Sequence, residues 1–153
     1  MKKKVFIYLG IGSFLGIFMY NALSNVQPKV IDNAPDWVPI TVAEELAADQ
    51  GKLILVDVFE QGCKFCRAME RDIYPDSTVR IVLDAGYIPV KIDGNSQETI
   101  EYKGREIAQL EFAQNFGVYT FPTTLLLDAE GNLVKKRTGF MNVDEFRRFL
   151  YNN

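Results

Sequence analysis

The sequence predicts an α/β fold in which helices flank a central mixed β-sheet, preceded by an N-terminal signal or anchor segment. Apolar runs of strand length alternate with helical segments, and the chain ends in two strands and a helix. A βαβ half followed by a ββα half yields one sheet with both parallel and antiparallel strands. A positively charged and then apolar N-terminus predicts the export segment.

The composition fits one globular domain with an appendage. Of the 153 residues, 48% are hydrophobic and 24% are charged, which suffices for a sizeable core. The net charge is −3 and the charges are interspersed, which argues against a nucleic-acid-binding protein. The absence of histidine excludes histidine general-base catalysis and histidine-ligated metal sites. We expect no nucleic-acid partner, no metal and no cofactor.

Residues 1–24 form the predicted export segment. Lysines at positions 2–4 precede an apolar run over residues 5–20, a pattern that keeps the charged end in the cytoplasm. The run is intermediate between a signal-peptide core and a full membrane span, so anchoring by residues 5–23 and release after Ser24 both stay open. Either outcome predicts an extracytoplasmic location, in the periplasm or on the outer face of the cytoplasmic membrane. A buried core helix is disfavoured because the run lacks a polar face.

The remaining chain divides into a linker and one domain. Residues 25–36 are polar and contain two prolines, which is typical of a linker. Residues 37–153 hold the predicted domain. Its expected strands are Leu53–Phe59, Tyr87–Ile92, Thr123–Leu127 and Leu133–Thr138. Its expected helices are Thr41 to just before Gly51, Cys63–Ile73, Ser77–Gly86, Arg105–Phe116 and Asn142–Tyr151, with a polar loop over 93–103.

Several of these helix boundaries carry capping signals. Thr41 and Glu44 have the spacing of a capping box, and Asn142 and Glu145 repeat that spacing at the last helix. Asp76 is a candidate N-cap for the helix that ends at Gly86.

The two cysteines are the candidate catalytic residues. Cys63 and Cys66 are three positions apart, at the junction between a buried strand and a helix, and lie on one helical face. Free N–H groups at the helix start, with Lys64 and Arg67 nearby, stabilise a thiolate and lower the pKa of Cys63 below ~8.5. Cys63 is then the predicted nucleophile, and Cys66 resolves the mixed disulfide. An inert buried pair is the alternative, and a zinc site would need more ligands.

Asp57 is the third candidate catalytic residue. It interrupts the apolar strand over residues 53–59, six positions before Cys63. Because burial of an isolated carboxylate is costly, we expect a raised pKa and a functional reason for this residue. An exposed position at a strand edge is the alternative.

The predicted domain resembles the thioredoxin superfamily. The resemblance rests on Leu-Val-Asp-Val-Phe ending at Phe59, the Cys-x-x-Cys pair, Val-Lys-Ile-Asp ending at Asp93, Phe-Pro-Thr ending at Thr123, and Gly139. Tyr74-Pro-Asp and the long stretch from Asp93 to Phe116 are similar to the extracytoplasmic branch that includes SoxW-type proteins. The resemblance implies a thioredoxin-like fold and thiol–disulfide exchange.

The resemblance also implies roles for single residues. Asp57 would exchange a proton with Cys66, and Pro122 would follow a cis bond beside the substrate, with Phe121 facing that substrate. The lysine that partners this aspartate in ordinary thioredoxins falls at Pro89, so we expect Asp57 to lack a lysine neighbour.

Two departures from the family pattern concern the motif itself. Gly62 stands where a tryptophan often precedes the first cysteine. Lys64 and Phe65 replace both the Gly-Pro of thioredoxins and the Pro-His of strong oxidants. The missing histidine predicts a reductase or isomerase rather than an oxidase.

Three functions therefore remain under comparison. The first is an extracytoplasmic oxidoreductase that exchanges disulfides with protein thiols, and we expect it to be monomeric. The second is a binding module of the same fold, tethered to a membrane complex and carrying a structural disulfide. The third is an electron-relay partner of a membrane reductase, serving cytochrome maturation or sulfur metabolism.

Overall fold

The computed structural model describes residues 12–21 and 31–151. The chain divides into two units, Met1–Val30 and Ile31–Asn153, and each is described by itself. In the first unit, residues 12–21 are helical, and the rest of the predicted export segment lies outside the described residues. Within these described ranges, no helix is both long and apolar enough to cross a membrane.

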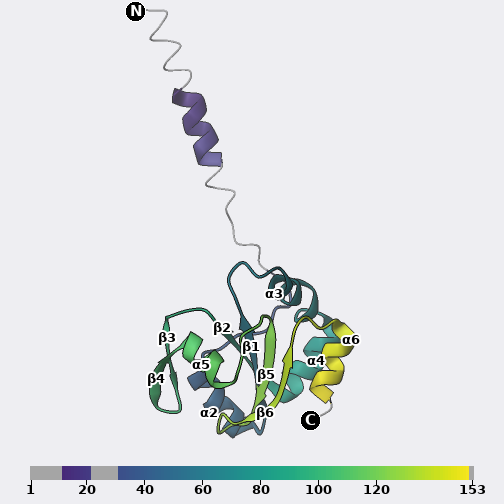
Figure 1. Cartoon of the computed structure of the whole chain (residues 1–153). Helices are drawn as coiled ribbons and strands as arrows, with labels where there is room; N and C mark the ends of the chain where they lie inside the picture. Colours follow the sequence, from purple (N-terminus) through teal and green to yellow (C-terminus); the bar gives the residue numbers. More distant parts are fainter. Residues whose placement is uncertain (1–11, 22–30, 152–153) are drawn as a thin grey trace, which may run out of the picture. The chain divides into compact units, whose positions relative to one another are not determined.

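The second unit is built on a four-stranded mixed sheet with helices on both faces, as predicted (Figure 1). The strand order is β2-β1-β5-β6, with β1 and β2 parallel and the other neighbours antiparallel. The strands are β1 (Leu53–Phe59), β2 (Tyr87–Asp93), β5 (Thr123–Leu127) and β6 (Leu133–Thr138). The four predicted strands are thereby confirmed, the second extended by one residue.

Helices cover the two faces of this sheet in separate groups (Figure 1). Helices α2 (Ile40–Gln50) and α5 (Gln109–Asn115) pack on one face. On the other face pack η1 (Met69–Ile73), α4 (Ser77–Gly86) and α6 (Val143–Tyr151). Helix α3 (Lys64–Ala68) precedes η1, which continues it with the wider π spacing, so the predicted helix over 63–73 is confirmed with this change.

The side chains of β1 alternate between the two faces. Ile54, Val56 and Val58 belong to the core beneath α2 and α5, whereas Leu55 belongs to the core beneath η1, α4 and α6. Because strand residues alternate, Asp57 faces the same side as Leu55. The strand is therefore buried on both faces, and its carboxylate is directed toward the helices that follow the cysteines.

The capping predictions have mixed outcomes. Asp76 caps α4 by accepting from Thr78 and Val79 N–H groups, as expected. The predicted box at Thr41 is wrong, because α2 begins at Ile40 with Pro39 as its N-cap and no side-chain cap bond. Proline already fixes a backbone angle suited to helix entry and leaves Thr41 inside the first turn.

The prediction for residues 93–116 is wrong in part. In place of a polar loop and a long helix, the chain forms a hairpin of β3 (Thr99–Tyr102) and β4 (Arg105–Ala108), and α5 is shorter than expected. Its two-residue turn, Lys103 and Gly104, has φ of 50° and 69°, the geometry that suits tight hairpins. Burial of Tyr102 and Ile107 against the core stabilises the hairpin.

The capping box at the last helix yields a stability prediction. The Asn142 N–H donates to Glu145 Oε2, and the Glu145 N–H donates to Asn142 Oδ1, both at 2.9 Å. Replacing Asn142 with alanine removes the acceptor and should lower the free energy of unfolding by about 1 kcal/mol. Urea denaturation measures this loss. The control Asn142→Asp keeps an acceptor and should retain stability, so an equal loss in both variants would contradict the capping role.

Candidate active site

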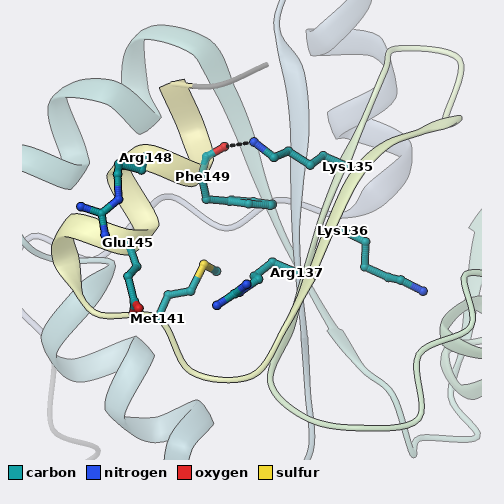
Figure 2. A pocket seen from close by; sticks show the side chains of 7 residues that line it. All are labelled: Lys135, Lys136, Arg137, Met141, Glu145, Arg148 and Phe149. Atoms are coloured by element: carbon teal, nitrogen blue, oxygen red, sulfur yellow. Dashed lines mark hydrogen bonds between the residues drawn. The ribbon is translucent and has the colours of Figure 1, made fainter.

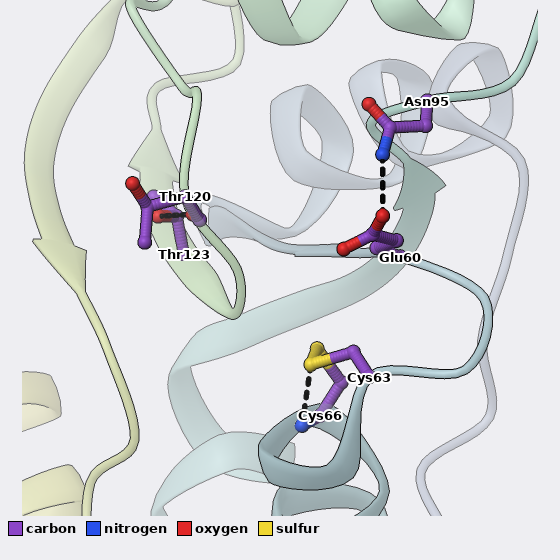
Figure 3. Close-up of a disulfide and its surroundings, with 6 residues drawn as sticks. All are labelled: Glu60, Cys63, Cys66, Asn95, Thr120 and Thr123. Atoms are coloured by element: carbon purple, nitrogen blue, oxygen red, sulfur yellow. Dashed lines mark hydrogen bonds between the residues drawn. A yellow bond between two sulfur atoms is a disulfide. The ribbon is translucent and has the colours of Figure 1, made fainter.

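The two cysteines form a disulfide at the start of α3 (Figure 3). Cys63 is the N-cap of the helix, and its sulfur accepts a hydrogen bond from the Cys66 N–H at 3.1 Å. Cys63 is half-buried, whereas Cys66 is only 5% exposed. In the reduced protein the same N–H would stabilise negative charge on Cys63, as expected for a nucleophilic thiolate.

Gly62 determines how the chain enters this helix. Its φ of 83° lies in the region that residues with a Cβ rarely adopt. The turn ends with the Cys63 N–H donating to the Glu60 carbonyl at 3.2 Å. With this backbone, a tryptophan or any other L side chain at position 62 would be strained.

Asp57 is buried beside the cysteine helix. It is 1% exposed, and neither its Oδ1 nor the buried Tyr74 hydroxyl and Thr124 Oγ1 has a hydrogen-bond partner of good geometry. Thr124 pairs with Asp57 across β5, and Tyr74 approaches from the end of η1. The exposed-edge alternative for Asp57 is therefore wrong.

Burial raises the pKa of Asp57 to about 6. The Tyr74 hydroxyl and the positive charge of Lys91 oppose this effect, while Glu70 adds to it. Burial also raises the pKa of Tyr74 well above its usual value, so Tyr74 stays protonated and can donate toward the carboxylate. A pKa of about 6 lets Asp57 take up or release a proton close to neutral pH.

A lysine does lie beside Asp57, so the expectation that it lacks one is wrong. Lys91 is the direct neighbour of Asp57 across the parallel β1–β2 pair, two residues beyond Pro89. Its Nζ bonds Glu70 Oε1 at 2.6 Å and lies 4.9 Å from the centre of the Phe59 ring. The positive charge near Asp57 therefore comes from Lys91, and not from position 89, where the resemblance places the lysine of ordinary thioredoxins.

A small cavity of about 100 Å³ lies beside the buried carboxylate and the second cysteine. Its lining includes Asp57, Cys66, Glu70 and Lys91. The cavity therefore places the carboxylate of Asp57, the Cys66 sulfur and the charged ends of Glu70 and Lys91 around one small space. Sequence reasoning missed Glu70 and Lys91, although period-two alternation in β2 does place Lys91 on one face with Pro89.

The loop before β5 lies near the disulfide (Figure 3). The bond between Phe121 and Pro122 is cis, as the resemblance implied. Thr123 Oγ1 donates to the Thr120 carbonyl at 2.7 Å, which fixes the loop end. Pro122 is buried, while Phe121 is half-buried with its ring against Gly94, where any side chain would collide with it.

A groove larger than the cavity beside Asp57 lies elsewhere, between β6 and α6 (Figure 2). It measures about 450 Å³, and its lining combines lysine and arginine side chains with Glu145, Met141 and Phe149 but includes none of the predicted site residues. Lys135, for example, donates there to the Phe149 carbonyl at 2.9 Å. Size alone therefore does not identify the site, since the chemistry is concentrated around the disulfide.

A thioredoxin-type sheet with a Cys-x-x-Cys disulfide at the start of the helix after β1 defines a class, the thiol–disulfide oxidoreductases. The chain belongs to the thioredoxin-like family, whose domain model matches residues 40–152. The narrower resemblance to SoxW-type proteins stays a prediction.

The chain is also similar to a curated relative in sequence and to two solved structures in fold. The thiol:disulfide interchange protein DsbD of Yersinia pestis (strain Pestoides F) is 24% identical over 143 residues, covering 92% of this chain and 22% of that protein. The chain thus spans about a fifth of that relative's length. A thioredoxin from Thermus thermophilus is 22% identical and has a TM-score of 0.60. The match covers 77% of this chain and 85% of the thioredoxin chain. The oxidised C-terminal domain of Neisseria meningitidis DsbD is 16% identical, with coverages of 71% and 88% and a TM-score of 0.54.

The raised pKa of Asp57 yields a prediction with a definite sign. An acid with a raised folded-state pKa binds its proton more readily in the folded chain, so ionisation costs stability. The pKa of Asp57 rises from 3.8 to about 6 on folding. The resulting loss of folding free energy is therefore absent below about pH 4, grows between pH 4 and pH 6, and reaches its full value above about pH 6. Asp57→Asn should therefore be more stable than wild type at pH 7, by up to about 3 kcal/mol. It should also exchange disulfides more slowly, because it cannot accept the Cys66 proton.

Urea denaturation at pH 4 and pH 7, with a disulfide-reduction assay across pH, measures both effects. The exposed Asp49 of α2 offers a control, because Asp49→Asn should change neither quantity. A destabilised Asp57→Asn protein with an unchanged exchange rate would mean that Asp57 is a structural residue.

Proposed function

We propose that this chain is an extracytoplasmic thiol–disulfide oxidoreductase that exchanges disulfides with protein partners through Cys63 and Cys66. The observation that carries the proposal is the asymmetry of the pair. Cys63 is only half-buried at the helix start, whereas Cys66 is buried and lines the same cavity as Asp57. An accessible sulfur can attack, and a buried sulfur beside a proton acceptor can resolve.

The reaction balances without a cofactor. The Cys63 thiolate attacks one sulfur of the partner's disulfide, forming a mixed disulfide while the partner's other sulfur leaves as a thiolate. Asp57 then takes the Cys66 proton, and the Cys66 thiolate attacks Cys63 Sγ, which releases the second partner thiolate. Two electrons pass to the partner, and the chain ends with the Cys63–Cys66 disulfide.

We further propose that the chain works as a reductant rather than an oxidant. Strong oxidants owe their potential to a greatly stabilised thiolate in the reduced form. Here Lys64 and Phe65 stand between the cysteines, and no histidine adds to the stabilisation. Protein disulfides are the proposed substrates, a membrane electron-donor reductase is the proposed source of electrons, and a monomer is the proposed state.

The first test separates the two cysteines. Cys66→Ser should accumulate a mixed disulfide with a disulfide-bonded peptide, because resolution is blocked, and Cys63→Ser should accumulate none. Mass spectrometry under non-reducing conditions measures the adducts. Adducts on Cys66 in the Cys63→Ser protein would reverse the assignment.

A reduction potential distinguishes an enzyme from a binding module with a structural disulfide. Equilibration of the wild type with glutathione should give a potential above about −300 mV, the range of exchange-active pairs. A lower potential would favour a structural disulfide.

The proposed location has its own test. The charged start and apolar run of residues 1–24 support export of residues 25–153. A reporter enzyme that is active only in the cytoplasm, fused after Asn153, should therefore be inactive. The same fusion lacking residues 1–24 should be active. Equal activity of both fusions would contradict export.

A further inference from the structure

Two aromatic side chains stand exposed beside the disulfide. Phe65, between the cysteines, is 58% exposed, and Phe140, in the loop after β6, is 39% exposed. Their ring centres are 6.3 Å apart with an interplanar angle of 47°. The pair therefore forms one continuous apolar surface, although 75 positions separate the residues in the sequence.

The backbone holds this surface in a fixed relation to the active site. Phe65 lies within α3, whose N-cap is Cys63 itself. Phe140 follows Gly139, whose N–H donates to the Pro122 carbonyl at 2.8 Å. Each ring is thus attached to an element of the proposed exchange site, one to the cysteine helix and one to the cis-proline loop.

Packing within the domain does not account for these rings. Neither Phe65 nor Phe140 belongs to the two core clusters, while the third aromatic of this region, Phe121, does pack against the core. Exposed aromatic pairs are costly to leave in water and are typical of binding surfaces.

The reaction itself requires contact with this surface. A partner must bring its sulfur against the Cys63 Sγ, so the residues that flank its cysteine cover the neighbouring α3 turn. Aromatic rings prefer tilted or edge-to-face contacts, which Phe65 and Phe140 already make with each other, and both rings are exposed, so an aromatic side chain of a partner can pack against them in the same way.

We propose that Phe65 and Phe140 select partner segments that carry an aromatic side chain beside the reacting cysteine. This inference rests on the proposed function and specifies its substrate class. The contact acts on partner binding, whereas electron transfer stays with the cysteines.

The test compares three synthetic peptides that carry an internal disulfide and differ only at the residue beside one cysteine, which is Phe, Leu or Ser. The pre-reduced full chain is mixed with each peptide, and the second-order rate is divided by the rate of the same variant with glutathione disulfide. This division removes any effect of Phe65 substitution on the potential. The wild type should prefer Phe over Ser by roughly three- to tenfold, with Leu between them.

Phe140→Ala should reduce that preference toward unity, and the double variant with Phe65→Ala should abolish it. Ile81, 71% exposed on α4, supplies the control, since Ile81→Ala removes exposed apolar surface elsewhere and should keep the preference. Equal wild-type rates with all three peptides, equal Phe and Leu rates, or a preference unchanged by Phe140→Ala would overturn the inference. Failure of the wild type to reduce glutathione disulfide would instead contradict the proposed function, and this inference with it.

Discussion

The structure of the site depends on one constraint, the burial of a carboxylate in the middle of the central strand. Asp57 is 1% exposed, and such a group is tolerated only where neighbouring charges and dipoles reduce the cost. Lys91 and Tyr74 supply that environment from β2 and from the end of η1. Because Cys66 lines the same cavity, the arrangement that makes this carboxylate tolerable also makes it available to the second thiol.

The elements around Asp57 together create the environment that its burial requires. Strand alternation directs the side chain toward η1, and the parallel register of β1 with β2 brings Lys91 alongside. Glu70 of η1 then accepts a hydrogen bond from Lys91. A partly compensated charge keeps the pKa of Asp57 near 6, whereas full neutralisation would fix the group as a permanent carboxylate.

Much of this fold could be predicted from local signals in the sequence. Apolar runs identified all four strands of the sheet, and short-range caps such as Asn142 identified helix starts. The hairpin around Lys103 and Gly104 could not be foreseen as easily, because its stability comes from burying Tyr102 against residues distant in sequence. Local preference alone favoured a loop and a helix there.

The site residues also fall into those that the local sequence suggests and those that depend on the tertiary structure. Cys63, Cys66 and Asp57 stand out by residue type and spacing, so the sequence alone suffices to propose them as site residues. The Lys91–Glu70 pair depends on strand register, and no local pattern specifies it.

The two cysteines face different requirements, and the structure separates them. In the proposed mechanism Cys63 meets the partners, and the exposed aromatic pair of Phe65 and Phe140 lies next to it. In the same mechanism Cys66 loses a proton before it resolves the mixed disulfide, and it is buried beside the polar cavity. Changes to the aromatic surface can therefore alter partner choice while the proton acceptor is preserved. This separation is a physical reason why one fold can serve many disulfide substrates with the same chemistry.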